Sequence, residues 1–173
     1  MSSMISGMVR VLLGLGSNLG ESRQAFSGCI GHLAAEGRIV TTSRLWRTRA
    51  VGPPQPEYLN GAIVIDWPGG PRSLLNRCLE LEAEAGRDRA QEERWGPRAL
   101  DLDLLLAETV VCRGPDLELP HPRFHHRRFA LEPAFEVAPE WTHCLLGRTV
   151  TELVHEARDR DPEAIISVSP FGT

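Results

Sequence analysis

The chain has 173 residues, of which 42% are hydrophobic and 24% charged, and its formal net charge is −4. These values are typical of one globular domain and exclude disordered and collagen-like chains. The sequence contains no lysine, so all 19 basic residues are arginine and mechanisms that need a Schiff base or a P-loop lysine are excluded. The four cysteines lack zinc-ligand spacing and are expected to be reduced, partly buried residues.

The N-terminal stretch resembles neither a signal peptide nor a membrane span, because its apolar run from Val9 is interrupted by Arg10 and no basic segment precedes it. We therefore expect a cytoplasmic, monomeric protein. A single domain is predicted over residues 1–173, with a core over about residues 9–160. Residues 1–8 and the tail after Asp161 show no pattern and are expected to be flexible.

In chain order, the first predicted elements are a buried strand over residues 9–15 and a helix that Gly37 ends. The glycines of residues 14–20 favour a tight turn between the two. Residues 39–47 and 58–67 then predict two strands that pair antiparallel across a proline-rich turn.

The second half begins with a helix that Ser73 is predicted to cap and that runs towards Gly86. ALDLDLLL, residues 99–106, predicts a strand, and residues 109–112 predict a short returning edge strand. Helices are predicted over residues 126–135 and 150–158. The order strand, helix, strand, strand, helix, strand is a split βαβ arrangement. We therefore expect an α+β fold, with a ferredoxin-like antiparallel sheet, helices packed on it and extra C-terminal helices.

Two acidic residues alternate with leucines in the last predicted strand. Successive side chains of a strand point to opposite faces, so Asp101 and Asp103 share one face. Paired carboxylates suit Mg²⁺, which fills its remaining positions with water and substrate phosphates. The alternative is that both carboxylates only solvate an exposed sheet face.

Four arginines, at positions 87, 89, 94 and 98, precede this pair on a loop that contains glycine and proline. Guanidinium groups bind phosphate oxygens in a bidentate manner, so the loop and the carboxylates together indicate a site for polyphosphate and magnesium. A salt-bridged surface loop, balanced by Glu92 and Glu93, is the alternative.

The segment PHPRFHHRRF, residues 120–129, combines histidines and arginines. His121 follows a rigid proline and is placed to donate to a phosphate, whereas the adjacent His125 and His126 are expected to be surface residues. Tyr58 and Asn60 share a strand face, and an aromatic ring beside a carboxamide suits a flat heterocycle with amide-like edges.

Four segments together resemble the 6-hydroxymethyl-7,8-dihydropterin pyrophosphokinases of folate biosynthesis. They are LGLGSNLG (residues 13–20), YLN (58–60), GRDR to RWGPRALDLDLLL (86–106) and LPHPRFHHRRF (119–129). The resemblance implies an ATP-dependent diphosphokinase that moves the diphosphoryl group of ATP onto the pterin hydroxymethyl oxygen and releases AMP. It implies ATP and the pterin as partners, with neither nucleic acid nor a membrane.

The resemblance also implies residue roles. Two Mg²⁺ ions would bind Asp101 and Asp103, and catalysis would involve these carboxylates with Arg87 and Arg98. The implied ATP contacts are Glu82, Arg87, Arg89, Trp95, Arg98, His121 and Arg127. The implied pterin contacts are Thr48, Val51, Tyr58, Asn60, Trp95 and Phe129. The loop over residues 87–98 would close over the site.

Two other functions are weighed against this one. An RNA-recognition module would use a similar sheet, but its aromatic motif is absent and the net charge is negative. A magnesium-dependent phosphohydrolase would use the same Asp101 and Asp103, and the nucleotide product distinguishes it.

Overall fold

A computed structural model describes residues 7–86 and 96–172, and in it one antiparallel sheet organises the chain. The central strand β1 (Met8–Ser17) pairs with β4 (Tyr58–Pro68) on one side and with β5 (Asp101–Ala107) on the other. β2 (Arg38–Thr42) and β3 (Leu45–Thr48) both pair with β4. This order, β3, β4, β1, β5, is that of the predicted ferredoxin-like core.

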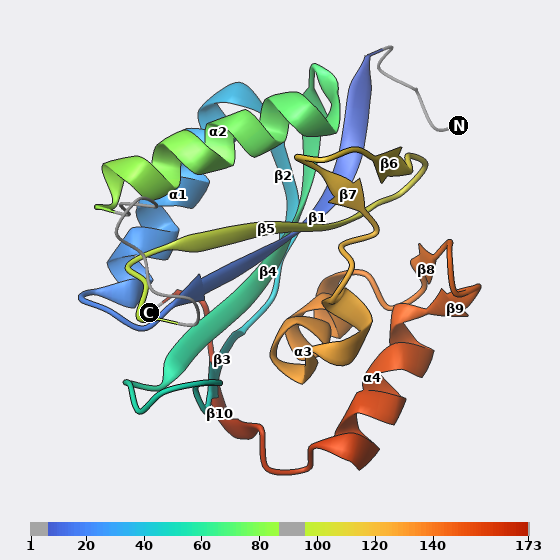
Figure 1. The fold of residues 1–173 in the computed structure, drawn as a ribbon. Helices are drawn as coiled ribbons and strands as arrows, with labels where there is room; N and C mark the ends of the chain where they lie inside the picture. Colours follow the sequence, from blue (N-terminus) through green and yellow to red (C-terminus); the bar gives the residue numbers. More distant parts are fainter. Residues whose placement is uncertain (1–6, 87–95, 173) are drawn as a thin grey trace.

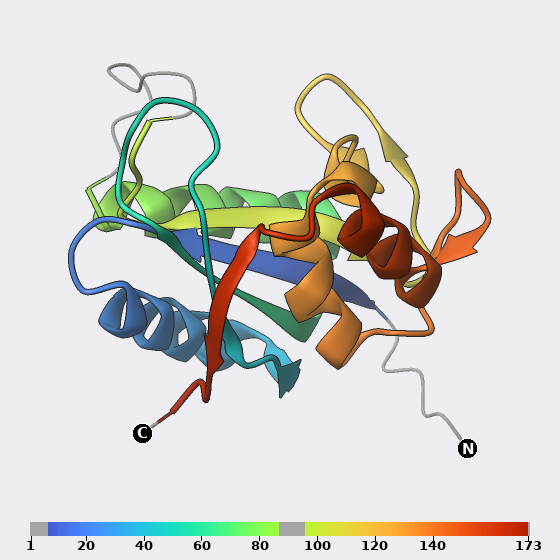
Figure 2. The same cartoon turned by 90° about the horizontal axis from the view of Figure 1, so that it is seen from below.

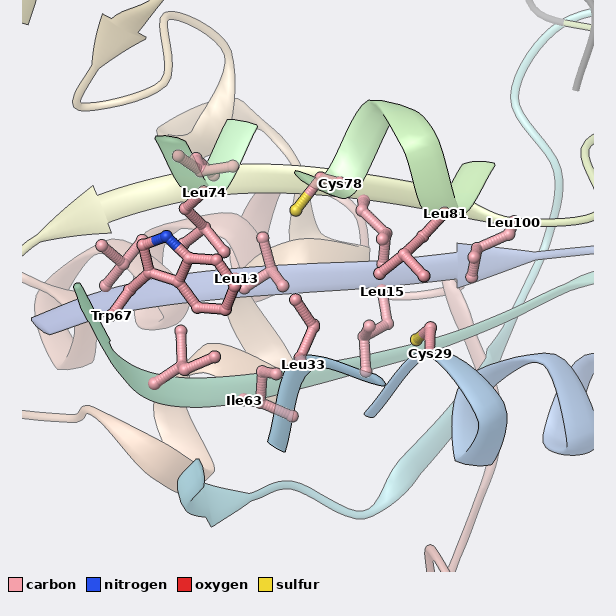
Figure 3. Close-up of a cluster of buried hydrophobic side chains, with 14 of the residues drawn as sticks. Leu13, Leu15, Cys29, Leu33, Ile63, Trp67, Leu74, Cys78, Leu81 and Leu100 are labelled. Carbon is pink, nitrogen blue, oxygen red and sulfur yellow. The ribbon is translucent and has the colours of Figure 1, made fainter. Parts of the chain in front are cut away.

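Helices α1 (Ser22–Glu36) and α2 (Gly70–Glu84) cover one face of this sheet (Figure 1). Leu13 and Leu15 of β1 point to that face and meet apolar side chains of both helices (Figure 3). The alternate leucines of β5 belong to the same cluster. The cluster includes Leu13, Leu15, Phe26, Cys29, Leu33, Ile63, Leu74, Cys78, Leu81, Leu102 and Leu104. Leu102, between the two acidic residues of β5, is therefore fixed by the core.

The opposite face is covered only in part. Helix α3 (Arg128–Val137) packs on β4, and α4 (Val150–Arg160) packs against α3 from outside. Their second core cluster includes Leu12, Ala62, Val64, Leu131, Ala134, Val150 and Val154. The remaining part of the face lies beyond α3 and carries the site described below.

Short elements connect these layers. β6 (Cys112–Arg113) pairs with β7 (Glu118–Leu119), and a 3-10 helix, η1 (Phe124–His126), leads into α3. β8 (Thr142–His143) pairs with β9 (Arg148–Thr149) before α4.

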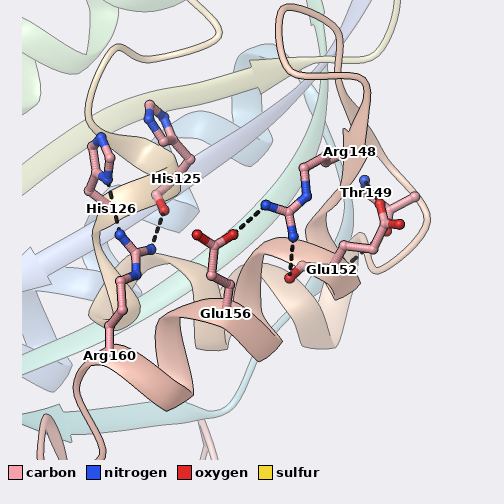
Figure 4. Close-up of polar contacts among 7 residues, drawn as sticks. All are labelled: His125, His126, Arg148, Thr149, Glu152, Glu156 and Arg160. Atoms are coloured by element: carbon pink, nitrogen blue, oxygen red, sulfur yellow. Dashed lines mark hydrogen bonds and ion pairs between the residues drawn. The ribbon is translucent and has the colours of Figure 1, made fainter.

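Helix α4 begins at a capping box, in which Thr149 and Glu152 exchange hydrogen bonds. Near its end, Arg160 donates to the His125 carbonyl and contacts the His126 ring (Figure 4). The first and last turns of α4 are thus both anchored.

The predicted fold class is confirmed, with four local corrections. The predicted strand 39–47 is divided into β2 and β3, because Ser43 Oγ rather than a carbonyl accepts from Ala62 N, at 2.9 Å. Residues 109–112 do not return to the main sheet; Cys112 belongs to the separate pair β6–β7. Ser73 lies inside α2, where its hydroxyl accepts from the Trp67 ring at 3.2 Å, and Gly69 is the N-cap.

The fourth correction concerns the tail after Asp161, which was expected to be flexible. It forms β10 (Ile165–Ser169), which pairs with β3 at the sheet edge (Figure 2). Cys29 and Cys78 are free and buried, as predicted, whereas Cys144 is exposed. Within residues 7–86 and 96–172, no helix combines the length and the apolar character needed to cross a bilayer.

Candidate active site

A cavity of about 210 Å³ lies on the part of the sheet that α3 leaves uncovered. Its floor is formed by β1, β4 and β5, and its walls come from the β3–β4 loop, the segment before β5 and the segment from His121 to α3. Its lining residues include Gly14, Gly16, Thr48, Arg49, Val51, Tyr58, Asn60, Arg98, Asp101, Asp103, His121, Arg123, Arg127, Phe129 and Ala130. Residues separated by more than a hundred positions thus share one cavity.

Two glycines make room on this floor. Gly14 is paired with Asp103 across the β1–β5 ladder, and Gly16 with Asp101. A Cβ atom at Gly16 would lie 3.5 Å from Asn60 Oδ1 and 3.7 Å from Asp101 Cβ. Both glycines lie inside β1, so the predicted tight turn over this segment is wrong for them. The missing side chain of Gly16 leaves the sheet surface open to a ligand, whereas at Gly14 an added Cβ would lie 3.1 Å from Leu105 Cδ1.

The two carboxylates point into the cavity from β5, each beside an arginine. Asp101 accepts from Arg98 at 2.7 Å, and Asp103 accepts from Arg127 at 3.2 Å. Leu102 between them is 4% exposed and points into the core. Burial, together with the charge of Asp101, raises the pKa of Asp103. Positive charge near Asp103 is therefore favourable.

These carboxylates fit a magnesium site that a substrate completes. Both provide oxygen donors on one face of a strand, and the Asp103 side chain is 36% exposed. Among residues 7–86 and 96–172, no cluster of three or more histidine, cysteine, aspartate or glutamate side chains could hold a metal by itself. Such a donor set matches Mg²⁺, which keeps water and phosphate oxygens as further ligands.

His121 also lines the cavity, where its ring interacts electrostatically with Asp103 and Arg127. Its Nδ1 atom accepts from the backbone N of Arg123 at 3.1 Å, so the neutral ring carries its proton on Nε2. Burial, together with the charge of Arg127, lowers the pKa of His121 against the opposing effect of Asp103. The neutral ring has an N–H donor on Nε2.

The other end of the cavity is aromatic and amide-like. The Tyr58 hydroxyl donates to the Gly96 carbonyl at 3.1 Å, and Asn60 Nδ2 donates to Thr48 Oγ1 at 2.8 Å. Asn60 and Thr48 are buried, and the Phe129 ring lies 5.7 Å below the Arg127 guanidinium carbon. The two rings and the carboxamide give this end the character that a flat heterocycle requires.

The structure brings most of the predicted site residues together. Those that line the cavity are Thr48, Val51, Tyr58, Asn60, Arg98, Asp101, Asp103, His121, Arg127 and Phe129. Glu82 does not: it is 1% exposed, and its carboxylate accepts from Leu102 N at 2.7 Å. Arg87, Arg89, Arg94 and Trp95 lie outside the described residues.

Sequence reasoning missed several lining residues, among them Gly14, Gly16 and Arg49. The signal for the glycines was their spacing of two within an apolar strand, which places both on one face. Arg49 follows β3 in a loop, where no periodicity indicates its direction.

Paired carboxylates, arginines and aromatic side chains in one cavity on an antiparallel sheet are features that a phosphoryl-transfer enzyme requires. Residues 12–139 match the family model for 7,8-dihydro-6-hydroxymethylpterin-pyrophosphokinase (HPPK). Two relatives carry the name 2-amino-4-hydroxy-6-hydroxymethyldihydropteridine pyrophosphokinase. The one from Synechocystis is 37% identical, over 92% of this chain and 80% of its own length. The one from Methylorubrum extorquens is 39% identical, over 91% of this chain and 98% of its own length. This chain belongs to the HPPK family, which confirms the predicted family and class of enzyme.

Solved structures are similar in fold. The crystal structure of Plasmodium falciparum HPPK-DHPS A437G with pteroate matches 93% of this chain with a TM-score of 0.68 and 14% sequence identity. This chain spans 45% of that longer chain, and a second crystal structure of the same protein, with STZ-DHP, gives a TM-score of 0.67. The similarity supports the α+β fold over most of this chain.

Proposed function

We propose that this protein transfers the diphosphoryl group of ATP to the hydroxymethyl oxygen of 6-hydroxymethyl-7,8-dihydropterin in folate biosynthesis. A bond forms between the hydroxymethyl oxygen and the β-phosphorus of ATP, and the bond from that phosphorus to the oxygen that bridges it to the α-phosphorus breaks. The bridging oxygen leaves with AMP, and the hydroxyl proton is released to water. The observation that carries the proposal is that one cavity is lined both by carboxylates and arginines, which we assign to a phosphate end, and by aromatic and amide side chains, which we assign to a pterin end.

At the phosphate end, Asp101 and Asp103 would hold two Mg²⁺ ions. When bound, these ions supply positive charge that neutralises the phosphate oxygens and lowers the pKa of the attacking hydroxyl. The two carboxylates are already oriented by Arg98 and Arg127, each through one Nη1 atom, so the remaining N–H donors of both guanidinium groups would bind phosphate oxygens. Fixed β-strand geometry keeps the carboxylates in place when substrate binds.

Arg98, Arg127 and His121 would bind the triphosphate. Arg98 lies beside Asp101, close to the place where charge develops at the β-phosphorus, and we assign it the catalytic role. Arg127 and the Nε2–H of His121 would orient the phosphates. The assigned roles of Arg87, Arg89 and Trp95, and the closing of residues 87–98 over the site, stay predictions because those residues lie largely outside the described part of the chain.

At the other end, the pterin would lie between Tyr58 and Phe129. Asn60 would bind its amide-like edge, and Thr48, which accepts a hydrogen bond from Asn60, fixes the carboxamide plane. Val51 would contribute from the β3–β4 loop. This arrangement directs the hydroxymethyl group of a flat ring towards Asp101 and Asp103.

Glu82 supports the site from the helix side of the sheet. Its buried carboxylate holds the backbone of Leu102 between the two acidic residues, so we assign it to the placement of Asp101 and Asp103. The nucleotide contact predicted for Glu82 is not part of this proposal, because its carboxylate does not line the cavity. The single domain, the monomeric state and the cytoplasmic location stay predictions.

The test is an assay of nucleotide products with ATP and Mg²⁺, with and without the pterin alcohol. AMP should form only when the pterin is present, in a one-to-one ratio with the pterin diphosphate. A matched control is Glu108→Gln, an exposed residue that follows β5, which should leave the rate unchanged. Release of ADP and phosphate from ATP alone would instead identify a phosphohydrolase.

A further inference from the structure

Asn18, the residue after β1, joins two segments that form walls of the cavity. Its side chain is almost fully buried, with the residue 7% exposed. Its Oδ1 accepts from the backbone N of Arg98 at 2.7 Å. Its Nδ2 donates to Gln55 Oε1 and to the Pro56 carbonyl, each at 2.9 Å. One amide group therefore bonds to both the segment before β5 and the β3–β4 loop.

The orientation of this amide is fixed by its partners. The oxygen faces an N–H donor and the nitrogen faces two acceptor oxygens, so only one of the two amide orientations satisfies all three contacts. A carboxamide is the side-chain group that offers an acceptor and two donors in one plane. Aspartate at this position would keep the acceptor for Arg98 N but would turn an oxygen towards the Pro56 carbonyl.

The backbone around Asn18 adds to the same link. The N–H groups of Asn18 and Leu19 both donate to the Arg98 carbonyl, at 2.9 and 3.2 Å. Arg98 is thus held at its N–H and at its carbonyl, while its guanidinium binds Asp101. The backbone of Arg98 cannot shift without loss of several buried hydrogen bonds.

The loop on the other side of the link leads directly to the pterin end of the cavity. Gln55 and Pro56 precede Tyr58, whose hydroxyl donates to the Gly96 carbonyl at 3.1 Å. Two links therefore connect this part of the chain to the segment before β5: Asn18 bonds to the loop and to Arg98, and Tyr58, the first residue of β4, bonds to Gly96. Both segments stand at the same end of the sheet (Figure 2).

We propose that Asn18 is a positioning residue that sets the placement of Arg98 against the β3–β4 loop, so that the phosphate end and the pterin end keep one relative geometry. The inference rests on the proposed function. Asn18 does not line the cavity and acts only through other residues. Its loss should lower kcat more than it raises the KM of ATP, because a displaced guanidinium loses transition-state contacts first.

The experiment is a double-mutant cycle between Asn18 and Arg98. Asn18→Ala should lower the single-turnover rate about tenfold, and the KM of ATP should change within about twofold. In an Arg98→Ala background the same substitution should change the rate within about twofold, because the group that it positions is gone. Because Arg98→Ala should itself lower the rate by ~10²–10³-fold, all rates are measured as single turnovers with enzyme in excess.

Further variants separate this role from a general loss of stability. Asn18→Asp keeps the bond to Arg98 N and should fall between wild type and Asn18→Ala. Gln55→Ala should lower the rate, and Gln55→Glu, which keeps the acceptor oxygen for Asn18, should restore it. These two carry the test if Asn18→Ala does not fold. Glu57→Gln, in the same loop but in a surface pair with Arg47, is the matched control and should behave as wild type.

Two outcomes would overturn the inference. One is an equal loss of rate from Asn18→Ala in the wild-type and Arg98→Ala backgrounds. The other is a lowered melting temperature of the Asn18 and Gln55 variants with unchanged kcat and KM, which is the signature of a purely structural residue. Absence of AMP release by the wild-type protein contradicts the proposed function instead, and the wild-type assay distinguishes that failure from a failure of the inference.

Discussion

Gly16→Ala should make the protein slightly more stable and much less active. The residue lies inside β1 without a positive φ, and an added Cβ would have its nearest neighbours at 3.5 to 3.9 Å, which is ordinary contact. Replacement of a strand glycine by alanine stabilises by ~0.5–1 kcal/mol. That corresponds to a rise in melting temperature of about 1–4 °C for a chain of this size.

The same methyl group would stand on the floor of the 210 Å³ cavity, between Asn60 and Asp101. Overpacking of a fitted site by one carbon costs ~1–3 kcal/mol, so kcat/KM should fall by about 5- to 150-fold. The assays are thermal unfolding by circular dichroism and steady-state AMP release. Gly28→Ala, on α1 with open space around the added Cβ, is the matched control and should raise stability without loss of activity. Wild-type kcat/KM in Gly16→Ala would show that substrate does not lie on this floor, and a lowered melting temperature would refute the packing argument.

Three further predictions address the carboxylates, the aromatic pocket and the histidines. Asp103→Asn should lower kcat by ~10²–10³-fold without lowering the melting temperature, since it removes a charge that burial and Asp101 disfavour but leaves the strand packing intact; full activity at saturating Mg²⁺ would exclude it as a metal ligand. Phe129→Ala should weaken pterin binding by about tenfold or less and leave ATP binding unchanged, as measured by calorimetry; loss of ATP binding instead would place the ring elsewhere. The rings of His143 and His125 are 5.4 Å apart, and burial lowers the pKa of both residues. The charges of His126 and Arg160 lower the pKa of His125 further, while the charge of Glu156 opposes them. The unfolded chain therefore binds more protons, so this contribution to stability is complete above about pH 6.5 and is lost as pH falls through the folded pKa values. His143→Phe should make urea unfolding at pH 7.5 and 5.5 more nearly equal than in wild type, and an unchanged difference would contradict this.

Local sequence patterns determined the elements and the chemistry of this protein. Apolar residues at helical spacing predicted α1 and α2, and the alternation of Asp101, Leu102 and Asp103 predicted which side chains share a face, because a strand has a period of two. The family motifs indicated the residues that we propose to bind phosphate and pterin. These signals depend only on near neighbours in the chain, so a sequence is sufficient to reveal them.

Other features depend on contacts between segments that are far apart in the sequence, and only the tertiary structure revealed them. The tail after Asp161 lacks a strong pattern, and it becomes β10 because the edge of β3 provides its hydrogen-bond partners. Gly14 and Gly16 resemble a turn in isolation, yet they form the cavity floor because β4 and β5 pair on either side of β1. Asn18 meets Gln55 and Arg98 only after three loops converge at one end of the sheet. Contacts between residues 37 and 80 positions apart leave no periodic trace in the sequence, so packing alone determines them.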